Sequence, residues 1–207
     1  MVKAQIGRKG EETRGLILER SEDIILQKSY SSVGIKEVLE ECRIPKGSFY
    51  HYFESKEDFG VQLLNHAAER YGRGLDELLS NDGTTGGEQL LCFFKFHIAF
   101  YESHDFKPTC LVSKLSSEVS TLSEAMREAL MTIANDWTGK FLSKVHLGQS
   151  DGSISDAINP DALAQFLYLA WVGANTQVVL TQSSKPFESL VECLAPVMTP
   201  AGTKTYP

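Results

Sequence analysis

The sequence of 207 residues lacks the features that mark membrane and secreted proteins. It contains no stretch of about 18 consecutive apolar residues, so a transmembrane helix is not expected. Its first ten residues, M-V-K-A-Q-I-G-R-K-G, lack an apolar core and do not resemble a signal peptide. We therefore expect a cytoplasmic protein with no membrane partner.

Cysteine is scarce, and its spacing argues against the usual cysteine-based sites. The four cysteines lie far apart and form no C-x-x-C pair (Cys42, Cys92, Cys110 and Cys193). This pattern argues against a disulfide framework and a zinc site, and it favours a reducing compartment. The five histidines are scattered and form no spaced ligand cluster. We expect neither a bound metal nor a cofactor.

The excess of positive charge that is typical of DNA-binding proteins is also missing, since the net charge is −7. Residues 1–60 carry 10 Lys and Arg and 11 Asp and Glu, a net charge of −1, whereas residues 61–207 carry 10 and 16, a net charge of −6. The first ten residues contain Lys3, Arg8 and Lys9 and no acid. This asymmetry permits nucleic-acid binding near the N-terminus without demonstrating it.

Internal repeats and alternating strand patterns are absent, and apolar residues recur at helical spacing throughout. The predicted fold is all-α, with about nine helices. Helices are expected over residues 11–29, 35–42, 46–53, 56–79, 88–102, from Pro108, 120–145, 162–180 and 186–197. Residues 81–87 are the clearest linker, residues 147–159 are predicted to form a polar loop, and residues 199–207 are predicted to form a flexible tail.

Two helix starts carry capping signals. Ser55 is followed three residues later by Asp58, as in a capping box. Asn159 precedes Pro160, which combines an N-cap residue with proline at the first helical position. Helices are therefore expected to begin directly after Ser55 and Asn159.

The stretch from Arg43 to Lys56, R-I-P-K-G-S-F-Y-H-Y-F-E-S-K, contains a short segment with unusual chemistry. Pro45 and Gly47 open it, and its hydroxyl, imidazole and cationic groups suit phosphates and base edges better than a core. With the two helices before it, this segment has the lengths of a helix-turn-helix module, whose recognition helix enters the major groove. Periodicity alone is equally compatible with a plain three-helix bundle.

Two motifs, Y-S-S-V-G-I-K-E-V-L and P-K-G-S-F-Y-H-Y-F-E-S-K-E-D-F-G, resemble the DNA-binding domain of the TetR family of one-component repressors. The resemblance implies a transcriptional regulator, usually a repressor, that binds a double-stranded DNA operator. It also implies a helix-turn-helix DNA-binding domain over residues 8–66 and a ligand-sensing and dimerisation domain over residues 67–198.

The resemblance assigns DNA contacts to the family's matching positions: Gly34, Lys36, Lys46, Gly47, Ser48, Tyr50, His51, Tyr52 and Lys56. The first two match backbone contacts, the next six match the recognition turn and helix, and Lys56 matches a phosphate-contacting lysine. A lysine at a helix N-terminus offers phosphate both its charge and free backbone N–H groups. Phe49 and Phe53, by contrast, fit the core of the module.

Residues 162–180 are apolar on more sides than one intramolecular partner covers, and Gly173 and Ala174 allow close helix approach. With residues 186–197 they are predicted to form a four-helix contact across a two-fold axis. A core helix in a monomer is the alternative. The resemblance favours a homodimer, which presents two recognition helices to half-sites about 34–36 Å apart.

Cys110 lies in a second unusual stretch, F-K-P-T-C-L-V-S-K-L-S-S-E-V. If Pro108 opens a helix, Cys110 lies near the positive end of the helix dipole, with Lys107 before it and Lys114 on the same helix face. Both effects favour a reactive thiolate. The alternative is a small buried hydrophobe, the usual state of a free cysteine, and this is what we expect for Cys42, Cys92 and Cys193.

The stretch C-L-V-S-K-L-S-S-E-V, with the later L-Y-L-A-W-V-G-A-N-T-Q, is similar to the NemR-type electrophile-sensing repressors of the same family. Acrylate-responsive repressors share the N-terminal half. The resemblance implies that Cys110 is the sensing cysteine. These sensors carry a lysine on the penultimate helix, and the matching position here is Val179.

Two other mechanisms remain open at this stage. A small apolar or aromatic ligand bound without a covalent bond is the first, with a pocket predicted from aromatic and polar residues (Phe93, Phe96, His97, Phe100, Trp137, Tyr168, Trp171 and Asn175). A thiol enzyme using Cys110 with His97 or His104 is the second. No oxyanion site or orienting acid supports the enzyme, so we expect a regulator and not an enzyme.

Overall fold

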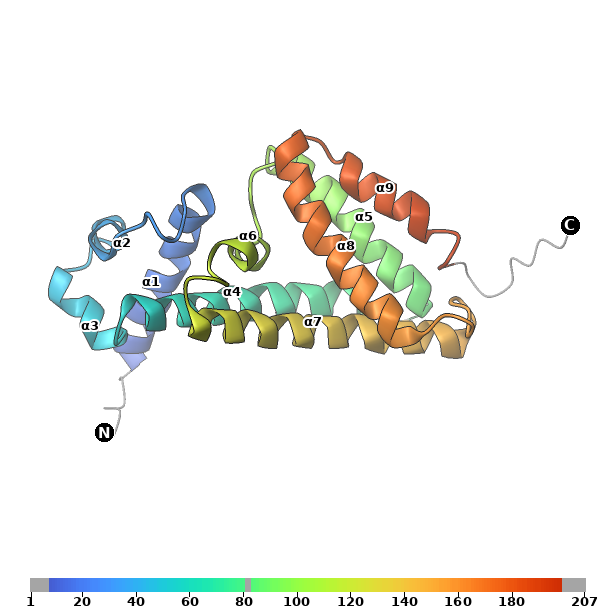
Figure 1. Cartoon of the computed structure of the whole chain (residues 1–207), viewed down its shortest axis with the longest axis horizontal. Helices are drawn as coiled ribbons and strands as arrows, with labels where there is room; N and C mark the ends of the chain where they lie inside the picture. Colours follow the sequence, from blue (N-terminus) through green and yellow to red (C-terminus); the bar gives the residue numbers. More distant parts are fainter. Residues whose placement is uncertain (1–7, 81–82, 199–207) are drawn as a thin grey trace, which may run out of the picture. The chain divides into compact units, whose positions relative to one another are not determined.

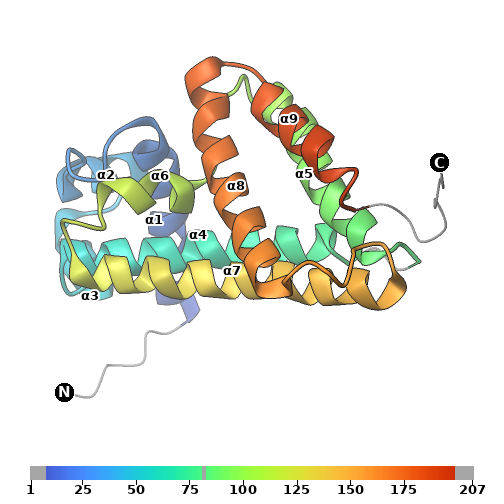
Figure 2. The ribbon, with the colours of Figure 1, turned by 45° about the vertical axis from the view of Figure 1, so that its right-hand side comes forward.

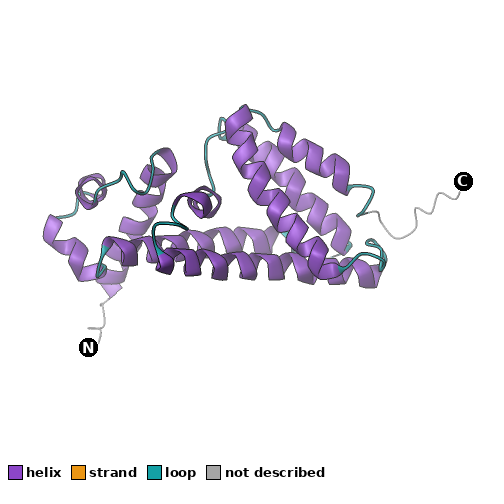
Figure 3. Ribbon diagram, in the orientation of Figure 1, coloured by secondary structure: helices purple, strands orange, loops and turns teal. Residues whose placement is uncertain are grey.

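The structure, a computed structural model of the chain, describes residues 8–80 and 83–198. Within these ranges it contains nine α-helices, one 3₁₀ turn (η1, Lys46–Ser48) and no strand (Figure 3). The predicted all-α fold is confirmed. Lys3 and the predicted tail over residues 199–207 lie outside the described residues.

The helices follow one another as labelled in Figure 1, with these bounds: α1 (Arg8–Gln27), α2 (Ile35–Cys42), α3 (Phe49–Tyr52), α4 (Lys56–Leu78), α5 (Gly86–Ser103), α6 (Leu111–Glu118), α7 (Glu124–Asp151), α8 (Pro160–Thr181) and α9 (Lys185–Leu194). Both predicted capping signals are confirmed. The backbone N–H of Asp58 donates to Ser55 Oγ at 3.0 Å, and that of Ala162 donates to Asn159 Oδ1 at 2.9 Å.

Two predicted boundaries are wrong. Helix α5 begins inside the predicted linker because the N–H groups of its first turn find acceptors in the chain. Gly86 N–H donates to Asp151 Oδ2 at 2.7 Å, and Gly87 N–H donates to Ser153 Oγ at 3.0 Å. Thr85 adds a capping box with Glu88. Helix α7, in turn, continues to Asp151, into the predicted polar loop, where that carboxylate caps α5.

The described chain forms two compact units, and each is discontinuous in sequence. The first unit comprises residues 8–70 and 109–131, so α6 belongs with the N-terminal helices. The second unit comprises residues 71–80, 83–108 and 132–198. Helices α4 and α7 contribute residues to both units.

The core of the first unit includes three aromatic rings from the short third helix and the start of α4. Phe49 and Phe53 are 0% and 1% exposed, which confirms that both are core residues. Their ring centroids lie 4.9 Å apart, and Phe59 lies 5.5 Å from Phe49 and 5.1 Å from Phe53. These contacts hold a four-residue helix that has too few hydrogen bonds of its own to be stable alone.

The second unit has a larger aromatic core. Helix α9 packs against both α5 and α8, as the view in Figure 2 shows. The core side chains with less than 2% exposure here include Phe93, Phe141, Trp171 and Phe187. Trp137 packs edge to face against Trp171 at 5.2 Å between ring centroids. Such packing contributes more stability than the burial of area alone.

Helix α8 is long and apolar enough, by these two criteria alone, to cross a membrane, although no such helix was expected from the sequence. Its most apolar 18-residue window has a mean hydropathy of 1.2, and 44% of that window is buried inside the structure. One face packs in the second unit through Leu167, Trp171 and Val178. The rest of this window is not buried within the structure.

Candidate functional site

The turn between α2 and the short third helix depends on one residue with left-handed backbone conformation. Arg43 has a φ of 54°, and its N–H donates to Glu40 O at 3.1 Å. Ile44 N–H then donates to Leu39 O at 2.9 Å. This pair of hydrogen bonds is the Schellman motif, which ends a helix and reverses the chain. Pro45 follows and fixes the extended entry into η1.

The predicted recognition helix is a 3₁₀ turn followed by a four-residue α-helix. Phe49 faces the core, whereas the next residue, Tyr50, is 63% exposed and is one of the most exposed large apolar side chains among the described residues. Gly47 and His51 are exposed, and Ser48 and Tyr52 are half-buried. The segment therefore presents aromatic and hydrogen-bonding groups to solvent. The side chain of Lys46 lies outside the described residues.

The other three predicted DNA-contacting residues lie at helix starts in the same unit. Gly34 is the exposed N-cap of α2, and the side chain of Lys36 is 79% exposed, with Nζ 3.6 Å from Glu40 Oε1. Lys56 is the first residue of α4. Its Nζ donates to Ser31 O at 3.3 Å and lies 5.0 Å from the centroid of the Tyr30 ring. Positive charges and unpaired N–H groups at helix starts suit phosphate binding.

Cys110 is the N-cap of α6, which begins at Leu111. The predicted helix start at Pro108, with Cys110 inside the first turn, is therefore wrong. Its side chain is 5% exposed, and Sγ accepts a hydrogen bond from Ser113 N–H at 3.4 Å. Burial raises the pKa of the Cys110 thiol to about 12, because the loss of hydration outweighs the hydrogen bonds from the helix N-terminus. Of the two alternatives for Cys110, burial favours the small buried side chain, and the thiol is protonated at neutral pH.

The two lysines expected to activate Cys110 are engaged elsewhere. Lys114 donates to the carbonyl oxygens of Leu26 and Lys28, both at 2.6 Å. Lys107 lies 3.4 Å from the carboxylate of Asp105. Burial lowers the pKa of Lys114, although Glu118 opposes this effect. The structure shows no interaction of either ammonium group with the thiol.

A buried carboxylate near Cys110 was not predicted. Glu22 on α1 is 3% exposed, and its Oε1 pairs with Arg70 at 2.5 Å. Its Oε2 accepts no hydrogen bond among the described residues, and burial raises the pKa of this carboxyl in spite of the Arg70 charge. The Glu22 charge also contributes to the raised pKa of Cys110. The burial of Glu22 could have been predicted from its position, four residues after Leu18 and three before Ile25, which places it on the apolar face of α1.

The remaining cysteines do not all behave as predicted. Cys42 is buried, as expected, and burial raises its thiol pKa. Cys92 and Cys193 are exposed, so their assignment to apolar packing is wrong. Both lie on the solvent side of helices whose opposite face is buried. Any thiol reagent therefore meets these two cysteines before Cys110.

Most of the residues predicted to line a ligand pocket pack against one another in the second unit. Trp137, Trp171 and Phe93 are nearly fully buried, Tyr168 is 8% exposed, and Phe100 is half-buried. Phe96 is 42% exposed. The prediction that these side chains bind a ligand remains untested by this packing.

His97, one of the two polar groups in this set, is fully satisfied. Its Nδ1 lies 2.8 Å from Phe93 O, and its Nε2 lies 2.6 Å from Tyr71 Oη and 3.2 Å from Trp171 Nε1. The indole N–H can only donate, so Nε2 is the acceptor and Nδ1 carries the proton. Burial lowers the pKa of His97 to about 4, and the imidazole is neutral at physiological pH.

Asn175, the other polar group, is 3% exposed and is also paired within the second unit. Its Oδ1 accepts from Tyr101 Oη at 2.6 Å, and its Nδ2 donates to Trp171 O at 2.7 Å. Val179, which the resemblance matches to the lysine of the NemR-type sensors, is half-buried on α8. No group of three or more His, Cys, Asp or Glu side chains suited to a metal ion occurs in the part of the chain that the structure describes.

Two family profiles match the chain. The profile described as bacterial regulatory proteins, tetR family, matches residues 17–61, which include α2 and the short third helix. The profile described as tetracyclin repressor-like, C-terminal domain, matches residues 86–194, more than half of the chain.

Among curated relatives, the transcriptional repressor NemR of Escherichia coli (strain K12) is 34% identical over 178 residues, which are 86% of this chain and 89% of NemR. The transcriptional regulator AcuR of Cereibacter sphaeroides is 33% identical over 165 residues, 80% of this chain and 75% of AcuR. The crystal structure of E. coli NemR in its reduced form superposes with a TM-score of 0.82 at 34% identity and covers 91% of this chain and 99% of that one. The chain belongs to the TetR family of bacterial transcriptional regulators.

Proposed function

We propose that this DNA-binding regulator represses transcription as a homodimer and leaves its operator when a small electrophile or oxidant modifies Cys110. The supporting observation is that Cys110 is both the N-cap of α6 and almost completely buried. Protein interiors are packed too densely for an adduct of several atoms to fit without displacement of the surrounding helix. Modification of Cys110 thus acts on the position of α6.

The buried thiol reacts through local opening of the start of α6. Its pKa of about 12 leaves almost no thiolate in the closed state, so attack follows a fluctuation that exposes the sulfur. With an α,β-unsaturated carbonyl compound, the sulfur loses its proton to water and forms a bond to the β-carbon. The α-carbon then takes up a proton from water. The S–H bond is thus added across the double bond, and no further reactant is consumed.

The adduct then traps the displaced α6. Helix α6 belongs to the same compact unit as the helix-turn-helix elements and the start of α4. Its displacement changes the positions of these elements and, in a dimer, the spacing of the two recognition helices. Half-sites about 34–36 Å apart tolerate little change in that spacing, so the operator is released.

The proposed dimer uses the side of α8 that the second unit leaves uncovered. Phe166, Leu169 and Leu180 are 53%, 58% and 73% exposed, and the exposed Gly173 lies between them along the helix. Apolar side chains around a small residue are a common arrangement where two helices approach closely. A second copy of α8 related by a two-fold axis covers this face in both chains at once. A repressor of this kind acts in the cytoplasm.

The test compares Cys110→Ser with the double variant Cys92→Ser and Cys193→Ser, which removes the two exposed thiols. Operator binding is measured by gel shift with the DNA upstream of its own gene, before and after N-ethylmaleimide. We expect all unmodified proteins to bind. We expect maleimide to release the wild type and the double variant but not Cys110→Ser.

Release of Cys110→Ser by maleimide would contradict the thiol mechanism. If that variant is instead released by a small aromatic compound that forms no covalent bond, a non-covalent inducer replaces the electrophile. Turnover of an electrophile without loss of thiol would contradict both forms of the proposal.

A further inference from the structure

We infer that Lys114 and Glu118 of α6 are positioning residues for DNA binding, because they hold the end of α1 and the turn that leads into α2. The inference deepens the proposed function, since it identifies the contacts through which a displaced α6 acts on the DNA-binding elements. Both residues lie in the first unit, and their spacing of four places them on one face of α6.

Lys114 binds the C-terminal end of α1. Helix α1 ends at Gln27, so its last carbonyl oxygens lack partners within the helix. The Lys114 ammonium group donates hydrogen bonds to Leu26 O and Lys28 O, both at 2.6 Å. A positive charge at this end also interacts favourably with the helix dipole. Lys114 therefore fixes where α1 ends relative to α6.

Glu118 binds the turn directly after that end. Its Oε1 accepts hydrogen bonds from Ser29 Oγ at 2.6 Å, Ser31 N–H at 3.0 Å and Ser31 Oγ at 3.2 Å. Partial burial alone raises the pKa of Glu118, but the hydrogen bonds from Ser29 and the Ser31 backbone outweigh it, and the pKa is lowered. Glu118 is thus ionised at neutral pH, and its hydrogen bonds are charge-assisted.

The turn that Glu118 holds is connected to two predicted phosphate contacts. Lys56 Nζ donates to Ser31 O at 3.3 Å, and Tyr30 Oη donates to Lys56 O at 2.5 Å. On its other side, the turn leads into α2, which begins at Ile35 and carries Lys36. A shift of the turn therefore moves Lys56 and the start of α2 together.

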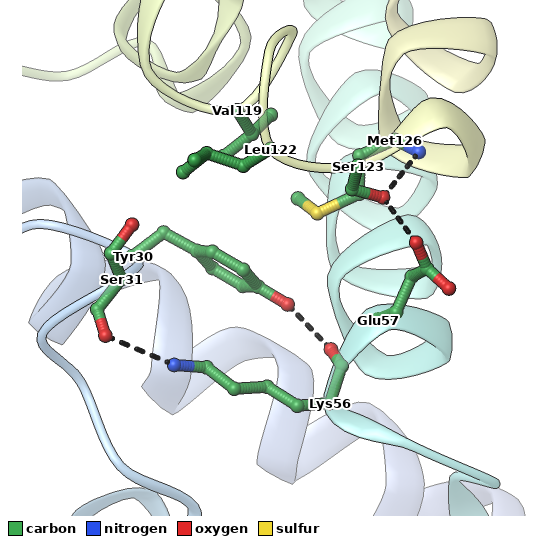
Figure 4. A pocket seen from close by; sticks show the side chains of 8 residues that line it. All are labelled: Tyr30, Ser31, Lys56, Glu57, Val119, Leu122, Ser123 and Met126. Atoms are coloured by element: carbon green, nitrogen blue, oxygen red, sulfur yellow. Dashed lines mark hydrogen bonds between the residues drawn. The ribbon is translucent and has the colours of Figure 1, made fainter.

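A cavity of about 230 Å³ lies between this turn and the corner that joins α6 to α7 (Figure 4). It is lined by Tyr30, Ser31, Lys56, Glu57, Val119, Leu122, Ser123 and Met126. At one edge of it, Ser123 Oγ donates to Glu57 Oε1 at 2.6 Å (Figure 4). Tyr30, Val119 and Met126 in this lining are buried, and hydrogen bonds of Lys56 and Ser123 join its polar edges. A displacement of α6 therefore changes the packing and the hydrogen bonds of the turn together.

Helix α6 connects this polar contact to Cys110 over a short distance. It has eight residues, with Cys110 as its N-cap and Glu118 at its C-terminal end. At about 1.5 Å per residue the two positions are about 12 Å apart along one short helix. A helix of this length moves as a unit, so an adduct at its N-cap is expected to break the hydrogen bonds of Lys114 and Glu118.

The experiment uses the full-length, unmodified protein with three variants: Glu118→Ala, Lys114→Met and Glu118→Gln. Glu118→Ala and Lys114→Met should each weaken operator binding about tenfold, the effect of one or two hydrogen bonds to charged groups. Glu118→Gln keeps an acceptor oxygen and should recover most of the affinity. The controls Glu77→Ala and Lys95→Met, which change exposed charges in the second unit, should bind like the wild type.

Wild-type affinity in Glu118→Ala, or no recovery in Glu118→Gln, would overturn the inference. Thermal unfolding of each variant shows whether it is folded, and Glu118→Gln remains informative if Glu118→Ala is not. Because these measurements need no thiol chemistry, they hold even if Cys110→Ser is still released by maleimide. In the double variant Lys114→Met and Glu118→Ala, a Cys110 adduct should cause less than a threefold additional loss, since both sets of contacts that it breaks are already absent.

Discussion

The two compact units differ in how their parts are held together. Around α6, the first unit combines buried apolar side chains of this helix with hydrogen bonds that Lys114 and Glu118 form with the end of α1 and the turn after it. The second unit relies on aromatic rings in mutual contact around Trp171, with His97 paired at both ring nitrogens. Hydrogen bonds of half-buried side chains can be replaced by hydrogen bonds to water at a small net cost, whereas a packed aromatic core resists displacement. This difference suits a switch at α6 and a stable second unit.

The largest expected effect is a loss of stability of the second unit in the variant Gly86→Ala. An added Cβ at Gly86 lies 2.3 Å from Gly148 N and 2.5 Å from Lys144 O, and neither backbone atom can move aside easily. Gly86→Ala should therefore lower the free energy of unfolding by about 3 kcal/mol. The control is Gly139→Ala in α7, where a Cβ meets nothing within 4 Å and the protein should become slightly more stable. Equal unfolding curves for the two variants would refute the close backbone contact.

The next effect concerns the neutral His97 in the same core. Its pKa is lowered to about 4, so the unfolded state binds a proton more readily as the pH falls below the unperturbed His value of about 6.5. The stability that neutral His97 confers is complete above about pH 6.5 and is lost as the pH falls towards 4. Between pH 7 and pH 4.5 the loss should be about 2 to 3 kcal/mol.

This pH dependence is measured by chemical denaturation at several pH values. His97→Phe should abolish most of the slope, although it is less stable at pH 7 because Tyr71 and Trp171 lose their acceptor. The exposed His146 provides the matched control, and His146→Gln should keep the wild-type slope. An unchanged slope in His97→Phe would show that other groups dominate the acid sensitivity.

A smaller effect tests the recognition helix in the first unit. Tyr50 is 63% exposed and lies next to the fully buried Phe49. Tyr50→Ala should weaken operator binding about tenfold, while the free energy of unfolding changes by less than about 0.5 kcal/mol. Gel shift and denaturant unfolding on the same preparation separate the two quantities. Normal operator affinity in this variant would exclude Tyr50 from the interface.

The smallest effect concerns the packing beside the cavity. An added Cβ at Gly60 lies 2.4 Å from Tyr30 Oη and 2.7 Å from the flexible Met126 Sδ. Gly60→Ala should push Tyr30 away from Lys56 O, cost about 1 kcal/mol and weaken operator binding several-fold. Gly74→Ala on the same helix α4 meets nothing within 4 Å and serves as the control. Unchanged DNA binding in Gly60→Ala would argue against a role of the Tyr30 contact.

Local patterns predicted the elements of the fold well. The caps at Ser55 and Asn159 and the core positions Phe49 and Phe53 are set by residues within one turn of each other, so the sequence contains their causes. Helix α5 was misjudged because Asp151, which caps its first turn, is 65 residues away. Without knowledge of this distant partner, the glycine-rich residues 81–87 are predicted to be a linker.

The chemistry of Cys110 was not predictable for the same reason. The spacing correctly predicts that Lys114 lies one helical turn after Cys110. However, the Lys114 ammonium group donates its hydrogen bonds to carbonyl oxygens 88 and 86 residues away in the sequence. The burial of Cys110 and the nearby Glu22 charge also depend on contacts between distant segments. Local helix geometry favoured a thiolate, and tertiary burial reversed that preference.

The central claim is that modification of Cys110 releases the operator. The most direct test measures thiol modification and operator release in the same samples. The wild-type protein is mixed with a limiting amount of N-ethylmaleimide, and peptide mass spectrometry reports the adduct on each cysteine while a gel shift reports the bound fraction. We predict that the exposed Cys92 and Cys193 are modified first without release, and that release follows the slower modification of Cys110. Release that is complete while Cys110 is still unmodified would contradict the account.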